Sequence, residues 1–586
     1  MERNFLLFFF HKPFFGIGFE PHLFMRKHLL VLLTAFLSLP GFGQSGKYPK
    51  DAFRSPLDIP LVLSGTFGEL RGNHFHSGID IKTEGREGKK VFAAADGEIV
   101  RINVSPWGYG NALYVRHPNG FTTVYAHLQR FSTEIQAYVK RAQYRNQSFE
   151  VELYPPKGTF PVKSGDVIAL SGNSGGSGGP HLHFEIRDTR TEEPINPLLF
   201  GFEVPDHRAP DPEYITLVPL DENSWVEDGR EKLIPLGNNR FKVAKTLRAY
   251  GNVGLSTYVI DRLDGAWNSN GIFFIDQYVD SVQTFHFDTE RLAFHETRYI
   301  NAHMDYGEYL HRGRKTHRTF RLPCDELRMY GELKQDGVIE VLPGQTRTVR
   351  LVAGDVAGNT TEIEVRIAGV LPEHHSPPDG NRYPCQQVNF FRIDGLEAVF
   401  KAGSFYSDAW LTTSLEMGKD SIPRYSIEPV DIPVHHRFDL SIAVPPALSS
   451  IPGNQLCILR KDHRNRLDYE GGKLENGRIS TRPRDLGTFY IGVDSIPPVI
   501  RPLNISNGKD LTGWRSIRIK VSDDLSGLSE YKATIDGKWV LMEYDAKYDL
   551  LYHQFEDDFP SGEHVFSLEV ADDRGNRTSF QAHFSR

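Results

Sequence analysis

Two short stretches decide how this chain folds around a site: Asn73-His74-Phe75-His76-Ser77-Gly78-Ile79-Asp80-Ile81 and Gly179-Pro180-His181-Leu182-His183-Phe184-Glu185. Side chains alternate between the two faces of a strand, so His76 and Asp80 share one face. In the second stretch the two histidines and the glutamate share a face, while the leucine and the phenylalanine point toward a core. Imidazoles and a carboxylate suit Zn²⁺, and three protein ligands leave a fourth position for water. The two stretches therefore predict a zinc site on strands.

A competing interpretation is that these are ordinary surface or core histidines, and it holds for most of the 23 histidines of the chain. It fits this set poorly, because both stretches lie among glycines and beside alternating apolar residues.

Further motifs follow in a fixed order between residues 56 and 201, about a quarter of the chain. They are Val91-Phe92-Ala93-Ala94-Ala95-Asp96-Gly97-Glu98-Ile99-Val100, Gly108-Tyr109-Gly110-Asn111, Val124-Tyr125-Ala126-His127-Leu128 and Val162-Lys163-Ser164-Gly165-Asp166-Val167-Ile168-Ala169-Leu170-Ser171-Gly172. Together with H-S-G-I-D and H-L-H, this order resembles the lysostaphin-type (LytM-like) zinc endopeptidases, which cut peptidoglycan cross-links.

The resemblance implies an antiparallel β-domain of the duplicated-hybrid-motif type with a groove across it. It implies one Zn²⁺ held by His76, Asp80 and His183, and two catalytic histidines that are not ligands, His127 and His181. One of these two accepts a proton from water or stabilises the oxyanion as a donor, and the sequence leaves their division of roles open.

Three neighbouring residues complete the expected site. His74 is the nearest rival ligand, and we expect it to be structural, because the H-S-G-I-D motif places the ligand at His76. Asn111 and Tyr125 are candidates for lining the substrate groove, and the alternative that they are plain strand residues stays open.

Composition favours an all-β architecture. The 586 residues are 39% hydrophobic, contain 53 glycines and 36 prolines, and form many short alternating runs. The net charge is only −8, with no long run of one sign, which argues against nucleic acid as a partner.

The N-terminus predicts export. Met25-Arg26-Lys27-His28 precedes the apolar run 29–39, so residues 1–44 form the signal peptide region, with translation expected to start at Met25. The run is too short for a comfortable membrane span. We therefore expect a periplasmic, envelope-associated or secreted protein without a stable span after signal removal.

Domain boundaries follow from linkers and turn signals. We expect the peptidase domain at 47–204, immunoglobulin-like β-sandwiches at 213–370 and 497–586, and a β-rich domain at 385–495. A weak internal repeat links the two sandwiches: Gly254-Leu255-Ser256 recurs as Gly527-Leu528-Ser529, and a D-x-x-G-N hairpin at Asp355 recurs at Asp572. Asp523-Asp524 is expected to be a solvated turn, because a calcium loop needs more oxygen ligands.

The three cysteines allow one internal pair in an exported protein. Cys324 and Cys385 each follow a proline and flank a domain boundary, which favours their pairing over pairs with Cys457. Three unpaired thiols are the alternative.

The segment between the catalytic motifs predicts a helix. Thr133-Glu134-Ile135-Gln136 has the form of a capping box with Thr133 as N-cap, and apolar residues then fall on one face over 134–146. A short strand at 149–153 should follow. The insertion either covers a sheet edge or forms a wall of the groove.

These features together predict an exported zinc endopeptidase that hydrolyses peptidoglycan stem-peptide cross-links. The alternatives are a non-catalytic cell-wall binding or amidase-activating scaffold and an envelope adhesion protein. In each case the C-terminal β-domains would contact envelope proteins. The sequence does not identify the bond that is cut.

Overall fold

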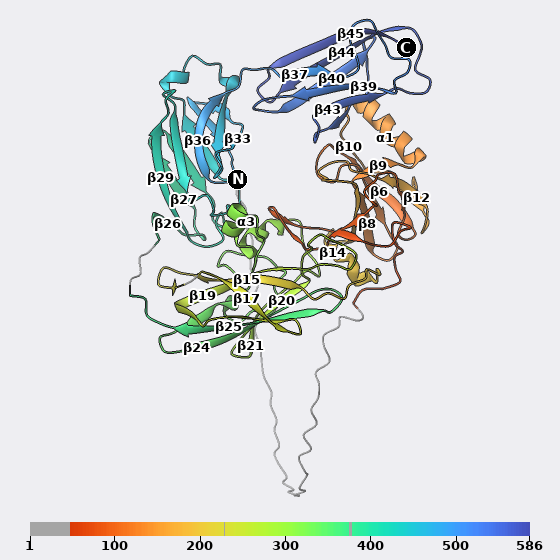
Figure 1. The fold of residues 1–586 in the computed structure, drawn as a ribbon. Coiled ribbons are helices and arrows are strands. Elements are labelled where there is room, and N and C mark those ends of the chain that lie inside the picture. Colours follow the sequence, from red (N-terminus) through yellow and green to blue (C-terminus); the bar gives the residue numbers. More distant parts are fainter. Residues whose placement is uncertain (1–46, 228, 374–377) are drawn as a thin grey trace, which may run out of the picture. The chain divides into compact units, whose positions relative to one another are not determined.

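The computed structural model describes residues 47–227, 229–373 and 378–586 (Figure 1). The expected signal peptide region 1–44 and the expected start at Met25 lie outside these residues. Within them, no helix is long and apolar enough to cross a membrane.

The N-terminal part is built on an antiparallel sheet with the strand order β1-β4-β13-β8-β7-β6-β10. Its strands are β1 Leu63–Gly65, β4 Ile79–Lys82, β13 His181–Asp188, β8 Phe121–Ala126, β7 Ala112–Arg116, β6 Gly97–Val104 and β10 Val151–Leu153; β11 Pro161–Val162 pairs with β6, and β14 Pro194–Ile195 with β13. A smaller sheet has the order β5-β12-β9, and β2 pairs with β3. Their bounds are β5 Lys90–Phe92, β12 Val167–Ser171, β9 Leu128–Phe131, β2 Leu70–Arg71 and β3 His74–Phe75.

Alternation of side chains explains why β13 lies at the centre of the large sheet. Leu182, Phe184 and Ile186 are completely buried in the core of this part. The intervening polar residues of the strand face the opposite side. The sequence predicts this division correctly, because a strand with one apolar face must bury it.

Helix α1, Thr133–Asn146, follows β9 and packs beside β10 (Figure 1). Ile135, Val139 and Ala142 are buried, as the predicted apolar face requires. The N-cap is Ser132 rather than Thr133, although Gln136 does reach back and accepts a hydrogen bond from the amide of Phe131 at 3.1 Å. Because β10 extends the sheet beyond β6, the insertion covers an edge; the groove-wall role stays a prediction.

Residues 211–369 form a sheet of order β16-β19-β15-β17-β18-β25-β24-β20-β21, and β19 also pairs with β25. The bounds are β15 Asp211–Pro219, β16 Trp225–Val226, β17 Arg230–Gly237, β18 Arg240–Val243, β19 Leu247–Ile260, β20 Phe274–Val279, β21 Val282–Asp288, β22 His317–Arg318, β23 Ile339–Val341, β24 Thr346–Gly354 and β25 Thr360–Gly369. Short helices α2, Ile300–His303, and α3, Tyr306–Arg312, interrupt the strands.

The next two parts are each built from a pair of sheets. Residues 381–493 form the orders β26-β29-β30-β36-β32-β33 and β27-β28-β31-β35-β34. Their bounds are β26 Asn381–Tyr383, β27 Asn389–Ile393, β28 Leu396–Phe400, β29 Ala409–Met417, β30 Pro423–Glu428, β31 Asp439–Ala443, β32 Leu456–Lys461, β33 Leu467–Tyr469, β34 Lys473–Glu475, β35 Arg478–Thr481 and β36 Gly487–Val493.

Residues 499–585 form the orders β37-β39-β43-β42 and β38-β45-β44-β40-β41 around one core. The bounds are β37 Val499–Pro502, β38 Lys509–Asp510, β39 Ser516–Ser522, β40 Leu528–Ile535, β41 Lys538–Trp539, β42 Glu543–Asp545, β43 Leu550–Gln554, β44 Glu563–Asp572 and β45 Arg577–Ser585. The all-β fold class is confirmed; the immunoglobulin-like identity of two parts and the domain boundaries stay predictions.

Of the two sequence matches that predicted an internal repeat, one joins equivalent elements and the other does not. The two D-x-x-G-N motifs do form equivalent hairpins, β24–β25 and β44–β45. By contrast, Gly254 lies inside β19, whose counterpart is β39, because each pairs with the first strand of its part. Gly527 precedes β40 instead, so the G-L-S match joins strands that are not equivalent.

A disulfide joins Cys324 to Cys385, the pairing favoured from the sequence, and Cys457 is a buried free thiol.

The β2–β3 segment of the N-terminal part shares a core with the following part. Phe67, Leu70 and Phe75 are buried in one cluster with residues such as Phe287 and Met304. The amide of Phe75 also donates to Oγ1 of Thr297 at 2.9 Å. The chain segment that leads to His76 is therefore supported from outside the N-terminal part.

Candidate metal centre

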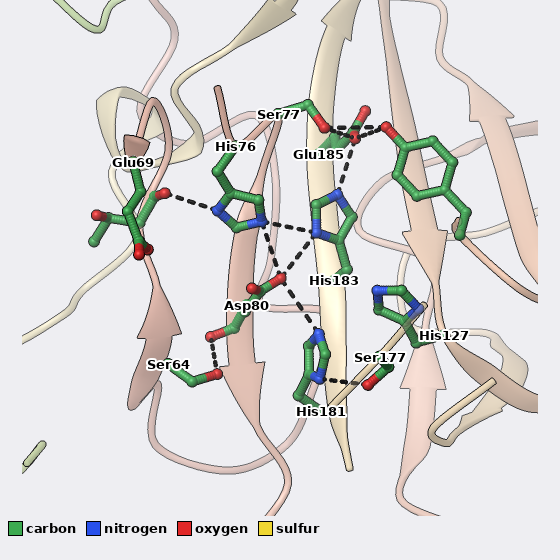
Figure 2. Close-up of polar contacts among 12 residues, drawn as sticks. Ser64, Glu69, His76, Ser77, Asp80, His127, Ser177, His181, His183 and Glu185 are labelled. Atoms are coloured by element: carbon green, nitrogen blue, oxygen red, sulfur yellow. Dashed lines mark hydrogen bonds and ion pairs between the residues drawn. The ribbon is translucent and has the colours of Figure 1, made fainter. Parts of the chain in front are cut away.

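Three neighbouring strands bring the predicted residues together. β13 lies between β4 and β8, and His183 is in register with Asp80 on one side and Ala126 on the other. Figure 2 shows His76, Asp80, His181, His183 and His127 pointing toward one another.

His76 does not lie on a strand with Asp80, contrary to the prediction. β3 ends at Phe75 and β4 begins at Ile79, and Gly78 lies in the bend between them. A Cβ on Gly78 would be 2.4 Å from the carbonyl oxygen of Phe184, so only glycine allows this close approach. The bend, rather than strand alternation, directs His76 toward Asp80.

The donor atoms of His76, Asp80 and His183 form a compact triangle. Nε2 of His76 lies 3.1 Å from Oδ1 of Asp80 and 3.0 Å from Nδ1 of His183, and Nδ1 of His183 lies 2.8 Å from the same oxygen. Ligands of a tetrahedral zinc ion, at about 2.0–2.2 Å from the metal, stand about 3.3–3.6 Å apart. The triangle is within a few tenths of an ångström of that arrangement, so these residues could hold a metal ion.

The ring nitrogens of His76 and His183 that face away from Asp80 make hydrogen bonds of their own. Nδ1 of His76 donates to the carbonyl of Thr66 at 2.7 Å, and Nε2 of His183 donates to Oε1 of Glu185 at 2.9 Å. A neutral imidazole has one N–H, so in neutral rings the nitrogens that face Asp80 carry lone pairs. Three possible ligand atoms therefore converge, and a cation between them can replace a proton on His183.

The electrostatics of the cluster also attract positive charge. Burial opposes charge on Asp80, but His76, His181 and His183 outweigh it and hold the pKa of that carboxyl well below its usual range. Burial likewise opposes charge on His183, yet Asp80 and Glu185 together raise the pKa of its imidazole to about 9. A proton or a metal ion can supply the charge that this environment favours.

Sequence reasoning missed the second layer of the site. Glu185 is completely buried, and Nε of Arg187 donates to its Oε2 at 2.6 Å. The hydroxyl groups of Ser77 and Tyr109 donate to its Oε1, each at 2.6 Å. A detectable signal existed, because two charged residues alternate with His183 on one face of β13. Such partners orient a metal-binding imidazole.

Arg71 is the other missed residue. Its Nη2 donates to Oδ2 of Asp80 at 2.6 Å, which leaves Oδ1 directed at the histidines. Nothing in its local sequence marks it, because β2 reaches the site only through the hairpin with β3.

His127 reaches the site by an unusual backbone conformation. Strand register pairs Ala126 with His183 on the site face, so simple alternation would direct the next residue into the core. His127 has φ of +57°, which turns its side chain back toward His181, with ring centroids 4.8 Å apart. Burial and the imidazoles of His183 and His181 lower the pKa of His127 to about 3, so its ring is neutral.

The two histidines predicted to be catalytic have fixed tautomers. Nδ1 of His127 donates to the carbonyl of Ser174 at 2.9 Å, and Nδ1 of His181 donates to that of Gly179 at 2.8 Å. The neutral ring of His127 therefore presents an unprotonated Nε2. Nε2 of His181 is 3.4 Å from Oδ1 of Asp80.

The glycine-rich loop before β13 packs against the loop that contains Gly108 and Gly110. A Cβ on Gly175 would lie 2.3 Å from the amide nitrogen of Gly110, and Gly176 donates to the carbonyl of Gly108 at 2.8 Å. These contacts position the carbonyl of Ser174 that holds His127.

The structure corrects the prediction for Tyr125. Its side chain is completely buried against Phe184 on the core face, and its hydroxyl oxygen accepts hydrogen bonds from Thr123 and from the amide of Ala94. It therefore cannot line the groove.

Asn111 and His74 both stand outside the cluster. The side-chain amide of Asn111 donates to the carbonyl of Leu128 at 3.1 Å, which ties two strands together. His74 is exposed, and its Nδ1 bonds the carbonyl of Gly72 at 2.9 Å, so it has no donor atom near Asp80.

Comparisons with known proteins show which families parts of the chain resemble. Residues 74–144 match the model of "Peptidase family M23", and residues 381–494 match that of the "Zu5-like domain". "DD-carboxypeptidase/endopeptidase Mpg" of Neisseria meningitidis is 35% identical over 155 residues, which are 25% of this chain and 29% of that protein. "Murein hydrolase activator NlpD" of Salmonella typhimurium is 30% identical over 152 residues, or 26% of this chain and 32% of that protein.

Among solved structures, the catalytic domain of lysostaphin from Staphylococcus simulans is 23% identical, with 24% of this chain and 93% of that chain covered and a TM-score of 0.19. The chain spans less than a third of the length of the curated relatives matched at 35% identity. The chain contains an M23 peptidase domain, as the resemblance to the lysostaphin-type family predicts, followed by further β-domains.

Proposed function

We propose that this chain is an exported zinc-dependent endopeptidase that hydrolyses peptide cross-links of peptidoglycan. The observation that carries the proposal is the convergence of three possible ligand atoms, Nε2 of His76, Oδ1 of Asp80 and Nδ1 of His183, within 3.1 Å of one another. Relatives named as peptidoglycan endopeptidases support the substrate class.

His76, Asp80 and His183 would hold the zinc ion through Nε2, Oδ1 and Nδ1. When bound, zinc supplies Lewis-acid chemistry that activates water and polarises the scissile carbonyl. Glu185 fixes the tautomer of His183 by accepting its Nε2 hydrogen, and Arg71 fixes the orientation of Asp80.

His127 and His181 would handle protons. In its neutral form, each ring has a free Nε2 that can accept a proton from the attacking water. Once protonated, the same nitrogen can donate to the oxyanion or to the leaving amine. The carbonyls of Ser174 and Gly179 keep both rings in this orientation.

A second candidate is a non-catalytic activator of other cell-wall hydrolases. The relative named as a murein hydrolase activator, at 30% identity, favours it. Both candidates place the C-terminal β-domains in contact with envelope proteins.

Mass spectrometry of muropeptides separates the two candidates. Purified peptidoglycan is incubated with the zinc-loaded protein or with Asp80→Ala. A hydrolase converts cross-linked muropeptides to monomers, and the variant does not. If neither protein changes the muropeptide pattern, the endopeptidase proposal is wrong and the activator role is favoured; the masses of the monomers identify the bond.

A further inference from the structure

Two clusters of three aspartates occupy the same places in two different β-parts of the chain. One contains Asp206, Asp261 and Asp355, and the other contains Asp494, Asp523 and Asp572. In each, one potential ligand oxygen per residue lies within 4.8 Å of the others. None of these six aspartates belongs to the H-S-G-I-D or H-L-H motif, so both clusters are separate from the M23 site.

The first aspartate of each cluster stands in the segment that leads into its part. Asp206 precedes β15, which begins at Asp211, and Asp494 precedes β37, which begins at Val499, by the same interval. The second aspartate directly follows the next long paired strand: Asp261 follows β19, and Asp523 follows β39.

The third aspartate of each cluster begins a D-x-x-G-N hairpin with the same hydrogen bonds. Asn359 donates its backbone amide to Oδ1 of Asp355 at 2.9 Å and its side-chain amide to Oδ2 at 2.8 Å. Asn576 repeats both contacts with Asp572, at 2.9 and 2.7 Å.

The same asparagine also holds the incoming chain. The side-chain amide of Asn359 donates to the carbonyl of Asp206 at 3.4 Å, and that of Asn576 donates to the carbonyl of Asp494 at 3.2 Å. The recurrence of the whole arrangement within one chain shows that it is a built feature rather than a chance grouping of surface acids.

Each cluster contains buried carboxylate oxygens without hydrogen-bond partners. Asp261 and Asp494 are each only 2% exposed, yet Oδ1 of Asp261 and Oδ2 of Asp494 accept no hydrogen bond. Oδ1 of Asp523 is also buried and unpartnered, while its Oδ2 accepts from the amides of Leu525 and Gly527.

Nothing in the described part of the chain neutralises these carboxylates. No lysine, arginine or histidine there forms an ion pair with any of the six aspartates. Burial, reinforced by the neighbouring carboxylates, raises the pKa of Asp261 to about 7, which shows how unfavourable the unpaired charges are. A buried carboxylate is normally paired or binds a metal.

We propose that each cluster is a calcium site that fastens the incoming segment to the hairpin of its β-part. Oxygen-only ligands suit a hard cation rather than zinc. Calcium–oxygen distances of about 2.3–2.6 Å put ligands on opposite sides of the ion about 5 Å apart. Three oxygens within 4.8 Å of one another can therefore share one ion. Water and backbone carbonyls complete its coordination. For Asp523, this proposal replaces the expectation of a plain solvated turn at Asp523-Asp524.

Calcium binding to the whole protein tests the proposal. The protein is freed of metal on a chelating resin, given one equivalent of zinc to fill the M23 site, and titrated with calcium by isothermal calorimetry. The wild type should bind two calcium ions, one for each cluster. Asp261→Asn and Asp523→Asn should each bind one. Asp524→Asn, whose exposed side chain neighbours Asp523, should still bind two.

Thermal unfolding gives a second readout of calcium binding, through its effect on stability. Calcium should raise the Tm of the wild type and raise that of the double variant Asp261→Asn/Asp523→Asn much less. Without calcium, the double variant should be at least as stable as the wild type, because it has lost like-charge repulsion. A wild type that binds no calcium at millimolar concentration and shows no calcium-dependent Tm overturns the proposal.

Discussion

The backbone conformation of His127 determines where its side chain lies. Strand alternation alone places it with Tyr125 in the core, and only its left-handed backbone brings the ring to the site. A non-glycine residue in this conformation is uncommon and is often found at functional sites. The sequence carries no mark of that conformation, so residue-level alternation predicts the wrong neighbours for His127.

The two non-ligand histidines should be separable from the ligands by experiment. We expect His127→Ala and His181→Ala to keep full zinc and to lose cross-link cleavage by about 10²–10⁴-fold, as general acid–base groups typically contribute that much. Zinc is measured by elemental analysis and the rate by muropeptide release. A metal-free variant would show that its histidine is a ligand, and normal turnover by both would refute the proton-transfer roles.

At the scale of elements, the sequence predicts the strands of the M23 part well. The strand expected through His181, Leu182 and His183 corresponds to β13, because it has one strictly apolar face. The predictions fail where backbone geometry, or contacts between residues distant in sequence, determine the position of a side chain. The bend at Gly78 removes His76 from β4, and Arg71 reaches Asp80 only through a hairpin.

Helix α1 should stabilise the M23 part through its buried face. Ile135 is 3% exposed, so Ile135→Ala should lower the free energy of unfolding by about 2–5 kcal/mol, through lost burial and the cavity it leaves. Arg141→Ala, on the exposed face of the same helix, is the control and should change it by less than about 0.5 kcal/mol. Urea unfolding measures both, and equal effects would contradict the edge-cover role of α1.

At the scale of the whole molecule, the site depends on contacts beyond the M23 part. The sequence suggests that residues 47–204 fold alone and bind zinc, because all the motifs lie within them. The structure gives a reason to expect that residues 47–204 are less stable alone than in the longer chain. Phe67, Leu70 and Phe75, which flank the segment carrying His76, are buried partly by residues 259–353.

We therefore expect a fragment of residues 47–204 to have a lower Tm and a weaker affinity for zinc than a fragment of residues 47–370. Removing the second part would expose three large apolar side chains, each worth about 1.5–3 kcal/mol when buried. Calorimetry and zinc titration of the two fragments make the comparison. Identical Tm and affinity would show that the shared core does not support the site.

Zinc content tests the proposed function most directly, since the proposed activity rests on the triangle of His76, Asp80 and His183. Elemental analysis of the zinc-loaded, dialysed protein should give about one zinc per chain. Asp80→Ala and His183→Ala should retain almost none, while His74→Ala, which changes a nearby histidine outside the cluster, should retain all of it. Full zinc in either ligand variant, or a metal-free His74→Ala, would contradict the assignment.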